Sequence, residues 1–265
     1  MNGYENDVVT ADIIEVLKIR NQLPRNDHVT CISTYAKKNK NDSHLINKDI
    51  PADDKFDWRD KHFIRPVLFQ GHCLGCWAIS IVETMESMAA IRGIDTALTA
   101  LSVQQLIDCS KTNHGCDRGD VKKALKYLCG DHIGITTAKE YPNTFKHQEC
   151  KPVKDGKRKI AEYWTYFNWD ETEMTKMIFH HGPLIVVVNA DPWVFYTGGV
   201  IQNSCSSQKL NHVVQVVGYD LTADPQFYII RNSWGEDWGI GGYAKLAIGS
   251  GLCGVNREVS LINVV

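Results

Sequence analysis

The chain has 265 residues, of which 43% are hydrophobic and 23% are charged, as in an ordinary globular protein. A formal net charge of −2 leaves no basic excess with which to bind nucleic acid or an anionic membrane surface. No apolar run reaches the roughly 18 residues that a membrane-spanning helix needs, so we expect no membrane insertion.

Residues 1–50 differ in character from the rest of the chain. They contain one short amphipathic stretch at 11–17, followed by the polar run KKNKNDS, and they have little to bury. We interpret them as an N-terminal extension or pro-segment. The first residues show no basic region followed by an apolar core, so no secretory signal peptide is expected. The glycosylation sequon at 41–43 has a meaning only if the chain is secreted.

The first predicted helix spans residues 76–91. Its apolar residues recur at helical spacing, and Gly93 supplies a stop signal directly after it. Glu83 and Glu86 face away from the apolar stripe of this helix.

Three further helices are predicted from the capping residues at their N-termini, Ser102, Asp120 and Asp170. Ser102 and Asp170 each stand three residues before the glutamine or glutamate that completes a capping box. After Asp120, an apolar stripe at helical spacing begins with Val121.

The pattern changes to short β-rich runs in the last third of the chain. These runs are separated by Gly, Asn, Asp and Pro, and they are LIVVV, VVQVV, FYIIR and YAKLAI. Helices first and strands later predict an α+β protein of two lobes, one helical and one rich in sheet.

The nine cysteines are an odd number, which in an oxidising compartment leaves at least one thiol free. The alternative is that all nine are reduced and buried as small hydrophobic residues. Cys73 and Cys76, in FQGHCLGCWAIS, suggest half a zinc site, a redox pair, or a disulfide cysteine beside a nucleophile. A zinc site usually needs two such pairs, and a redox pair would follow a strand in a β-α-β unit. Neither context is present, so the third interpretation is favoured.

A cysteine at a helix N-terminus has its thiolate stabilised by the helix dipole, but it needs a histidine partner to act as a nucleophile. His212 stands directly before one predicted strand, and Asn232 stands directly after another. Neighbouring strands can bring these two side chains together at the start of the helix that begins with Cys76. The asparagine would hold the imidazole in the required tautomer.

With these residues in place, the chain resembles the papain-like cysteine proteases, the cathepsin family. The similarity covers about four-fifths of the chain and rests on ordered motifs, namely FDWRD, QGHCLGCWA, LSVQQLIDC, GCDRGD, NHVVQVVGYD, NSWGEDWGIGGY and LCGV. It implies a peptidase domain at 51–265, with a helical lobe at about 60–165, a β-barrel-like lobe at about 166–265 and an active-site cleft between them. It also implies hydrolysis of peptide bonds through a thioester acyl-enzyme, with no metal or organic cofactor.

The resemblance assigns a role to each of five residues. Cys76 is the nucleophile, His212 is its base and acid, and Asn232 orients the imidazole. Gln70 donates to the developing oxyanion together with the backbone N–H of Cys76. Trp234 shields the bond between histidine and asparagine from water, which strengthens that bond.

The resemblance also implies three disulfides, Cys73–Cys116, Cys109–Cys150 and Cys205–Cys253. Cys31 and Cys129 have no counterpart in the family. Two hypotheses cover them: they bond each other, or Cys31 blocks Cys76 covalently while the extension is attached.

Substrate-binding residues are implied on both sides of the nucleophile. Leu74 replaces a glycine that borders the pocket for the residue before the scissile bond, and it adds bulk there. Arg118 replaces a second glycine, whereas Gly119, whose backbone pairs with extended substrate, is retained. Arg118 is also the first residue of an Arg-Gly-Asp tripeptide, which we interpret as a chance match.

The pocket for the second residue before the scissile bond, P2, is implied to have Glu258 at its floor, with Asp120, Val121 and Leu210 around it. Two carboxylates beside apolar groups predict that basic as well as apolar P2 side chains are accepted. The alternative is that Glu258 is simply solvated.

The interval from Cys109 to Cys150 has no room for the inserted loop of dipeptide-trimming relatives, so we expect endopeptidase action. The alternative, motivated by Leu74 and Arg118, is a catalytically silent homologue that binds peptides or protein partners. Expected partners are protein or peptide substrates, protein inhibitors and the chain's own pro-segment, with the protein itself a monomer. The disulfides and the resemblance together imply a lysosomal or extracellular location.

Overall fold

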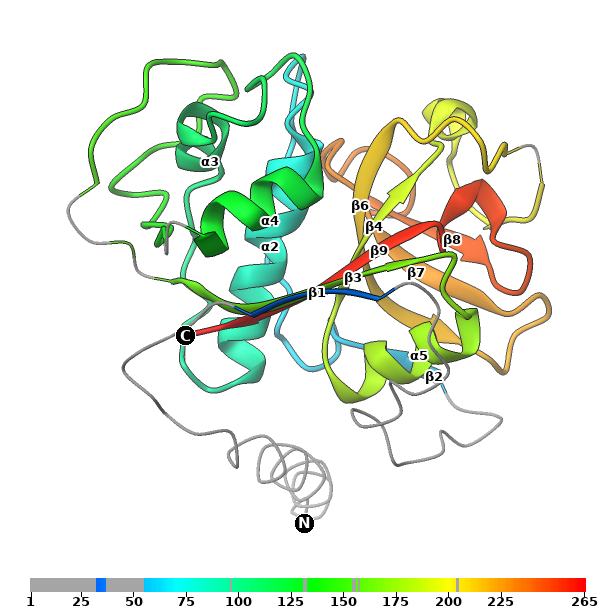
Figure 1. Ribbon diagram of the computed structural model, residues 1–265. Coiled ribbons are helices and arrows are strands. Elements are labelled where there is room, and N and C mark those ends of the chain that lie inside the picture. The colour runs from blue at the N-terminus through cyan, green and yellow to red at the C-terminus, as the bar shows by residue number, and fades with distance from the viewer. Residues whose placement is uncertain are drawn as a thin grey trace, which may run out of the picture.

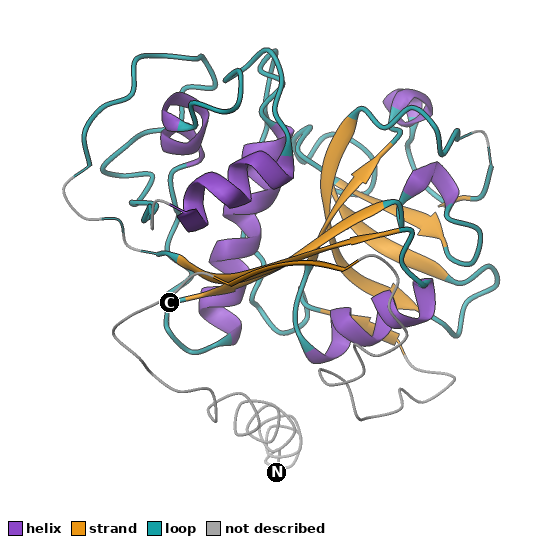
Figure 2. Cartoon of the chain, viewed as in Figure 1, coloured by secondary structure: helices purple, strands orange, loops and turns teal. Residues whose placement is uncertain are grey.

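A computed structural model describes residues 32–36 and 55–265, apart from 96, 131–132, 154–155, 157 and 204. Helices α2, α3 and α4 lie on one side of the molecule, and most of the strands lie on the other (Figures 1 and 2). This arrangement confirms the predicted α+β architecture with a helical and a sheet-rich part. No helix in the described part of the chain is both long enough and apolar enough to span a membrane.

The predicted helices form close to their predicted positions. They are α2 at Cys76–Ile91, α3 at Val103–Cys109, α4 at Val121–Gly130 and α5 at Glu171–His180. Ser102 caps α3 by accepting the backbone N–H of Gln105 at 3.0 Å, and Asp120 caps α4 by accepting that of Lys123 at 2.9 Å. Two short 3₁₀ turns, η2 and η3, lie at Asp191–Phe195 and Leu252–Gly254.

The described strands form one mixed sheet in the order β1-β3-β9-β4-β6-β7-β8-β5, with β2 paired to β6. Their bounds are β1 Ile32–Ala36, β2 Lys55–Asp57, β3 Ile160–Phe167, β4 Leu184–Val188, β5 Val200–Ile201, β6 His212–Asp220, β7 Phe227–Arg231, β8 Tyr243–Ala247 and β9 Glu258–Val264. The four predicted runs are β4, β6, β7 and β8. Strands β3 and β9 were not predicted, although they pair with each other along almost their whole length.

Strand β1 belongs to the residues interpreted as an extension, and it lies in the sheet. It pairs in parallel with β3 at the sheet edge, with Ile32 opposite Glu162 and Ala36 opposite Tyr166. Part of the extension therefore adds to the peptidase sheet. The amphipathic stretch at 11–17, the sequon at 41–43 and Cys31 lie outside the described residues.

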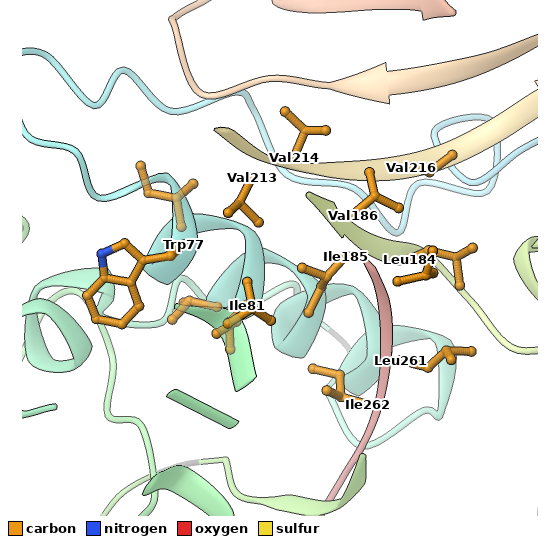
Figure 3. Close-up of a cluster of buried hydrophobic side chains, with 14 of the residues drawn as sticks. Trp77, Ile81, Leu184, Ile185, Val186, Val213, Val214, Val216, Leu261 and Ile262 are labelled. Carbon is orange, nitrogen blue, oxygen red and sulfur yellow. The ribbon is translucent and has the colours of Figure 1, made fainter. Parts of the chain in front are cut away.

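The core lies where α2 crosses the sheet. Figure 3 shows Trp77 and Ile81 of α2 beside Val213 of β6, with Ile185 of β4 and Ile262 of β9 close by. These five side chains are at most 5% exposed, and burying each one stabilises the fold by about 1.5–3 kcal/mol. This packing brings the first turn of α2 against the first residues of β6.

All sixteen residues of α2 are buried, including the two glutamates that were expected merely to face away from its apolar stripe. Glu83 is 2% exposed and Glu86 is 7% exposed. Helical spacing identifies the apolar face of a helix, but it does not show that other elements enclose the opposite face as well.

Candidate active site

Cys76 is the first residue of α2, and its thiol is free and buried. The neighbouring Cys73 is joined to Cys116, and Leu74 donates its backbone N–H to the Cys116 carbonyl at 2.8 Å. Gly75 is closely packed, since an added Cβ would lie 3.1 Å from Ile107. The disulfide and this packing fix the loop that presents the thiol. They also exclude a redox pair made of Cys73 and Cys76.

The described residues hold no group of three or more His, Cys, Asp or Glu side chains suited to a metal ion. Cys73 is committed to its disulfide, so it cannot ligate zinc together with Cys76. The zinc interpretation of the two cysteines is therefore wrong.

His212 begins β6, and Asn232 directly follows β7, the strand paired with β6. The imidazole Nε2 lies 2.7 Å from Asn232 Oδ1, which also accepts the backbone N–H of Ser233 at 2.8 Å. Because this oxygen is an acceptor, Nε2 is the nitrogen that carries a proton. Nδ1 is then left to interact with the thiol of Cys76.

Cys76 and His212 perturb each other electrostatically. Burial raises the pKa of the Cys76 thiol, but the charge of His212 and its hydrogen bond outweigh burial, so the net pKa is lowered. Burial lowers the pKa of His212, but the charge and hydrogen bond of Cys76 and the bond to Asn232 raise it overall. Both shifts favour a thiolate beside an imidazolium.

Gln70 is 5% exposed, and its side chain is held in place by two hydrogen bonds. Its amide donates one N–H to the Cys73 carbonyl at 2.8 Å, and its Oε1 accepts the Ser233 hydroxyl at 2.6 Å. The amide has a second N–H that these bonds do not use. Ser233 was not singled out from the sequence, although it stands between two residues that were.

Trp234 covers the imidazole. Its ring centroid lies 5.0 Å from that of His212, and Trp238 packs edge-on against it at 5.1 Å. The indole therefore packs against the imidazole that bonds Asn232, and its shielding of that bond from water stays a prediction.

The residues expected to contact the substrate backbone lie in two settings. An added Cβ at Gly119 would lie 2.3 Å from the Trp77 ring, so the lack of a side chain there is required by packing alone. Leu74 is 55% exposed. Its φ is not positive, so it fits its loop without backbone strain.

The four residues expected around the P2 pocket are not equally accessible. Val121 is 2% exposed and belongs to the hydrophobic core, while Leu210 is half-buried. Asp120 is occupied as the cap of α4. Glu258 accepts a hydrogen bond from Lys122 at 3.0 Å, a partner that sequence reasoning missed. The two lie far apart in the chain, so no local signal connects them.

Three disulfides join the same cysteines that the resemblance implies, Cys73–Cys116, Cys109–Cys150 and Cys205–Cys253. Cys129 is also disulfide-bonded, whereas Cys31 lies outside the described residues. Because the thiol of Cys76 is free, no covalent block occupies it.

A cavity of about 830 Å³ opens around the first turn of α5. Its lining includes Trp169, Glu171 and Arg257, and none of the predicted site residues. The cavity is therefore separate from the cluster of Cys76, His212 and Asn232.

The chain has close relatives in sequence. The family model described as papain family cysteine protease matches residues 52–262. Cathepsin O of Mus musculus is 39% identical over 223 residues, which are 83% of this chain and 70% of the relative. Cathepsin O of Homo sapiens is 40% identical over 224 residues, which are 83% of this chain and 69% of the relative.

Solved structures are similar to the described fold. The proform of the Amb a 11 cysteine protease, a ragweed pollen allergen, superposes with a TM-score of 0.75 at 35% identity, covering 82% of this chain and 67% of its own. Digestive procathepsin L 3 of Tenebrio molitor larval midgut has a TM-score of 0.75 at 30% identity, covering 83% of this chain and 72% of its own.

Proposed function

The chain belongs to the papain family of cysteine proteases, and from that premise we propose that it is an endopeptidase with Cys76 as its nucleophile. The observation that supports this most strongly is the free thiol paired with His212, whose Nε2 lies 2.7 Å from Asn232. A lowered thiol pKa beside a raised imidazole pKa favours the ion pair that attacks a peptide carbonyl.

The proposed reaction has two halves. The Cys76 thiolate attacks the scissile carbonyl carbon, and the negative charge on its oxygen is stabilised by the free amide N–H of Gln70 and the backbone N–H of Cys76. His212 gives its proton to the leaving amine, which leaves a thioester. The same imidazole, held by Asn232, then takes a proton from the water that hydrolyses the thioester.

The proposed P2 preference is for basic as well as apolar side chains. Glu258 supports it, but its carboxylate is shared with Lys122 at 3.0 Å. An arginine at P2 therefore competes with Lys122 for the same carboxylate. Lys122 also lies 5.1 Å from the Phe167 ring centroid, a second site that can hold its ammonium group.

The proposed location is lysosomal or extracellular. Three disulfides within the described residues support it, because such bonds persist in oxidising compartments. We also propose that residues 1–50 act as a pro-segment and that the mature enzyme acts on protein or peptide substrates as a monomer. The relatives of known structure include proforms, which supports the first of these proposals.

The proposal is tested by alkylation and by turnover. We expect an epoxide inhibitor to modify one thiol per chain, Cys76, at mildly acidic pH, and His212→Ala to lose this reaction. An internally quenched peptide blocked at both ends should be cleaved after removal of residues 1–50, and more slowly while they remain attached. Alkylation without cleavage would identify a silent homologue that binds peptides, and no alkylation at all would reject the catalytic pair.

A further inference from the structure

Arg231 is a buried cation close to the candidate site, and only 1% of its surface is exposed. Its guanidinium makes three polar contacts. Nη1 donates to Gln215 Oε1 at 3.2 Å, and Nη2 donates to the Pro66 carbonyl at 2.8 Å. Nη2 also lies 3.0 Å from Oε1 of Glu83. The three partners come from three different segments of the chain.

Each of these segments leads to one of the proposed catalytic residues. Glu83 lies two turns along the helix that begins with Cys76. Gln215 lies on β6, the strand that begins with His212. Pro66 lies in the segment that runs into Gln70.

The fourth segment is that of Arg231 itself. It is the last residue of β7, so Asn232 follows it directly, and it is the cross-strand partner of Gln215. One guanidinium therefore connects the segments that carry the nucleophile, the imidazole, the orienting amide and the oxyanion donor.

Gln215 strengthens the connection between β6 and α2. Its side chain is fully buried, and its amide donates to the Thr84 hydroxyl at 3.0 Å and lies 3.5 Å from the Ser87 hydroxyl. Both hydroxyl groups belong to α2. The interface between helix and sheet thus contains a polar group of four side chains around Arg231.

Stability alone gives little reason for this arrangement. Removing charged groups from water is costly, and well-packed apolar residues in place of a buried ion pair are often neutral or stabilising. An arginine has a planar fork of several donors in fixed directions, which suits it to holding several partners at set positions. The contacts of Arg231 use this property across the interface between α2 and the sheet.

We infer that Arg231 is a positioning residue for the peptidase reaction, holding α2, β6 and the segment before Gln70 in the relative placement that the reaction needs. It touches neither substrate nor reacting atoms. The inference rests on the proposed function. It deepens that proposal by naming the residue that aligns the four catalytic segments.

The test compares Arg231→Met, Arg231→Lys and Arg158→Met in the full chain. Arg158 lies 3.2 Å from Asp95, away from the catalytic residues, and Arg158→Met is the matched control. Active sites are counted by epoxide titration, so that kcat refers to folded enzyme only. We expect Arg231→Met to lower kcat by about 10- to 100-fold, since misplacement by about 1 Å costs about that much, while KM changes less than about twofold.

Two further readouts separate positioning from mere support of the fold. Arg231→Lys should recover part of the lost kcat, because it keeps the charge but reaches fewer partners. On the acidic side of the pH profile, Cys76 should be alkylated more slowly in Arg231→Met than in the wild-type chain, because the thiol and the imidazole are no longer aligned. Arg158→Met should lower thermal stability without changing kcat or the pH profile.

Several results would overturn the inference. Wild-type kcat per titrated site in Arg231→Met, with only a lower melting temperature, would make Arg231 structural. If Arg231→Met does not fold, Glu83→Met and Gln215→Met carry the test, and wild-type kcat in both would have the same meaning. Failure of the proposed function is distinguishable, since the wild-type chain itself would then neither react with the epoxide nor turn over.

Discussion

Glu86 is a carboxylate of α2 enclosed between the helices and the sheet. Its Oε1 accepts the backbone N–H of Leu101 at 2.7 Å, and its Oε2 lies 3.6 Å from Nε of Arg65. Burial raises the pKa of Glu86 to about 7, although the Leu101 N–H, Arg231 and Arg65 oppose the shift. The folded protein therefore binds a proton at Glu86 more tightly than the unfolded chain does.

The sign of the effect on stability follows from this shift. The stability that protonated Glu86 contributes to the folded protein is fully present below the ordinary glutamate pKa of 4.5, and it is lost as pH rises towards 7. The difference between the two pKa values corresponds to about 3 kcal/mol of unfolding free energy. Most of this loss falls between pH 5 and pH 8.

The perturbation is Glu86→Gln, made in a Cys76→Ala background that prevents autolysis and removes the thiolate–imidazolium pair. The amide oxygen of the glutamine can still accept the Leu101 N–H, so the variant should fold. We expect urea unfolding of the parent to show a free energy that falls from pH 5 to pH 8. In the variant, this decrease in the free energy of unfolding should be smaller by about 2–3 kcal/mol.

Glu83, whose pKa burial raises to about 8 despite the opposing charge of Arg231, remains in both proteins. The charge of Glu86 contributes to the raised pKa of Glu83, so the difference between the two stability curves reports the replacement of Glu86 together with its effect on Glu83. Glu173→Gln is the matched control, since this side chain is 43% exposed and pairs with Lys176 on the surface. Equal slopes for parent and Glu86→Gln, or a parent that gains stability up to pH 8, would refute the reasoning.

Substitutions at three other places have defined outcomes. Glu258→Ala should lower kcat/KM about tenfold for peptides with arginine at P2 but not for peptides with leucine there. Lys122→Ala should raise kcat/KM for the arginine peptides. Equal changes in kcat/KM for both kinds of peptide would reject this pocket. Gln70→Ala should lower kcat about 10²- to 10³-fold with little change in KM, and a wild-type kcat would remove Gln70 from the oxyanion site. Gly119→Ala should cost about 1–3 kcal/mol in urea unfolding, because its Cβ would overlap the buried indole beneath it, whereas Gly198→Ala, with nothing within 4 Å, should not.

Local sequence signals were sufficient for the four described α-helices and for four of the nine described strands. The hydroxyl of Ser102 and the carboxylate of Asp120 mark helix starts because a cap acts within three residues of itself. The LIVVV run became β4 with unchanged bounds, since five consecutive apolar residues suit a strand that is buried on both faces.

Strands β3 and β9 depend on partners that are distant in the chain. Trp164 pairs with Leu261, and Thr165 pairs with Ser260, across about a hundred residues. The expected lobe boundary at about 165 even falls inside β3, because its side chains do not alternate cleanly between buried and half-buried. Strand β1 depends on a distant partner even more, since Ile32–Ala36 joins the sheet only by pairing with the edge of β3.

The candidate site also contains some residues that the sequence identifies and others that only the structure reveals. The chemical types at Cys76, His212 and Asn232 point to a nucleophile, a base and an orienting group, and the fold brings the last two within 2.7 Å. Their polar supports could not be predicted. Ser233 holds Gln70 from a position 163 residues further along the chain, so only tertiary structure reveals that bond.

The buried carboxylates and the catalytic pair together limit the pH range in which this enzyme works. The lowered pKa of Cys76 lets the thiolate persist into mildly acidic solution, so by the proposed mechanism activity is lost when the thiolate is protonated at still lower pH. The raised pKa values of Glu83 and Glu86 make the fold less stable as pH rises towards 8. We therefore expect protonation of the thiolate to set the lower limit, and loss of the His212 proton together with the falling stability to set the upper limit. We expect an enzyme that is most active in acid and whose free energy of unfolding falls as the pH rises towards 8.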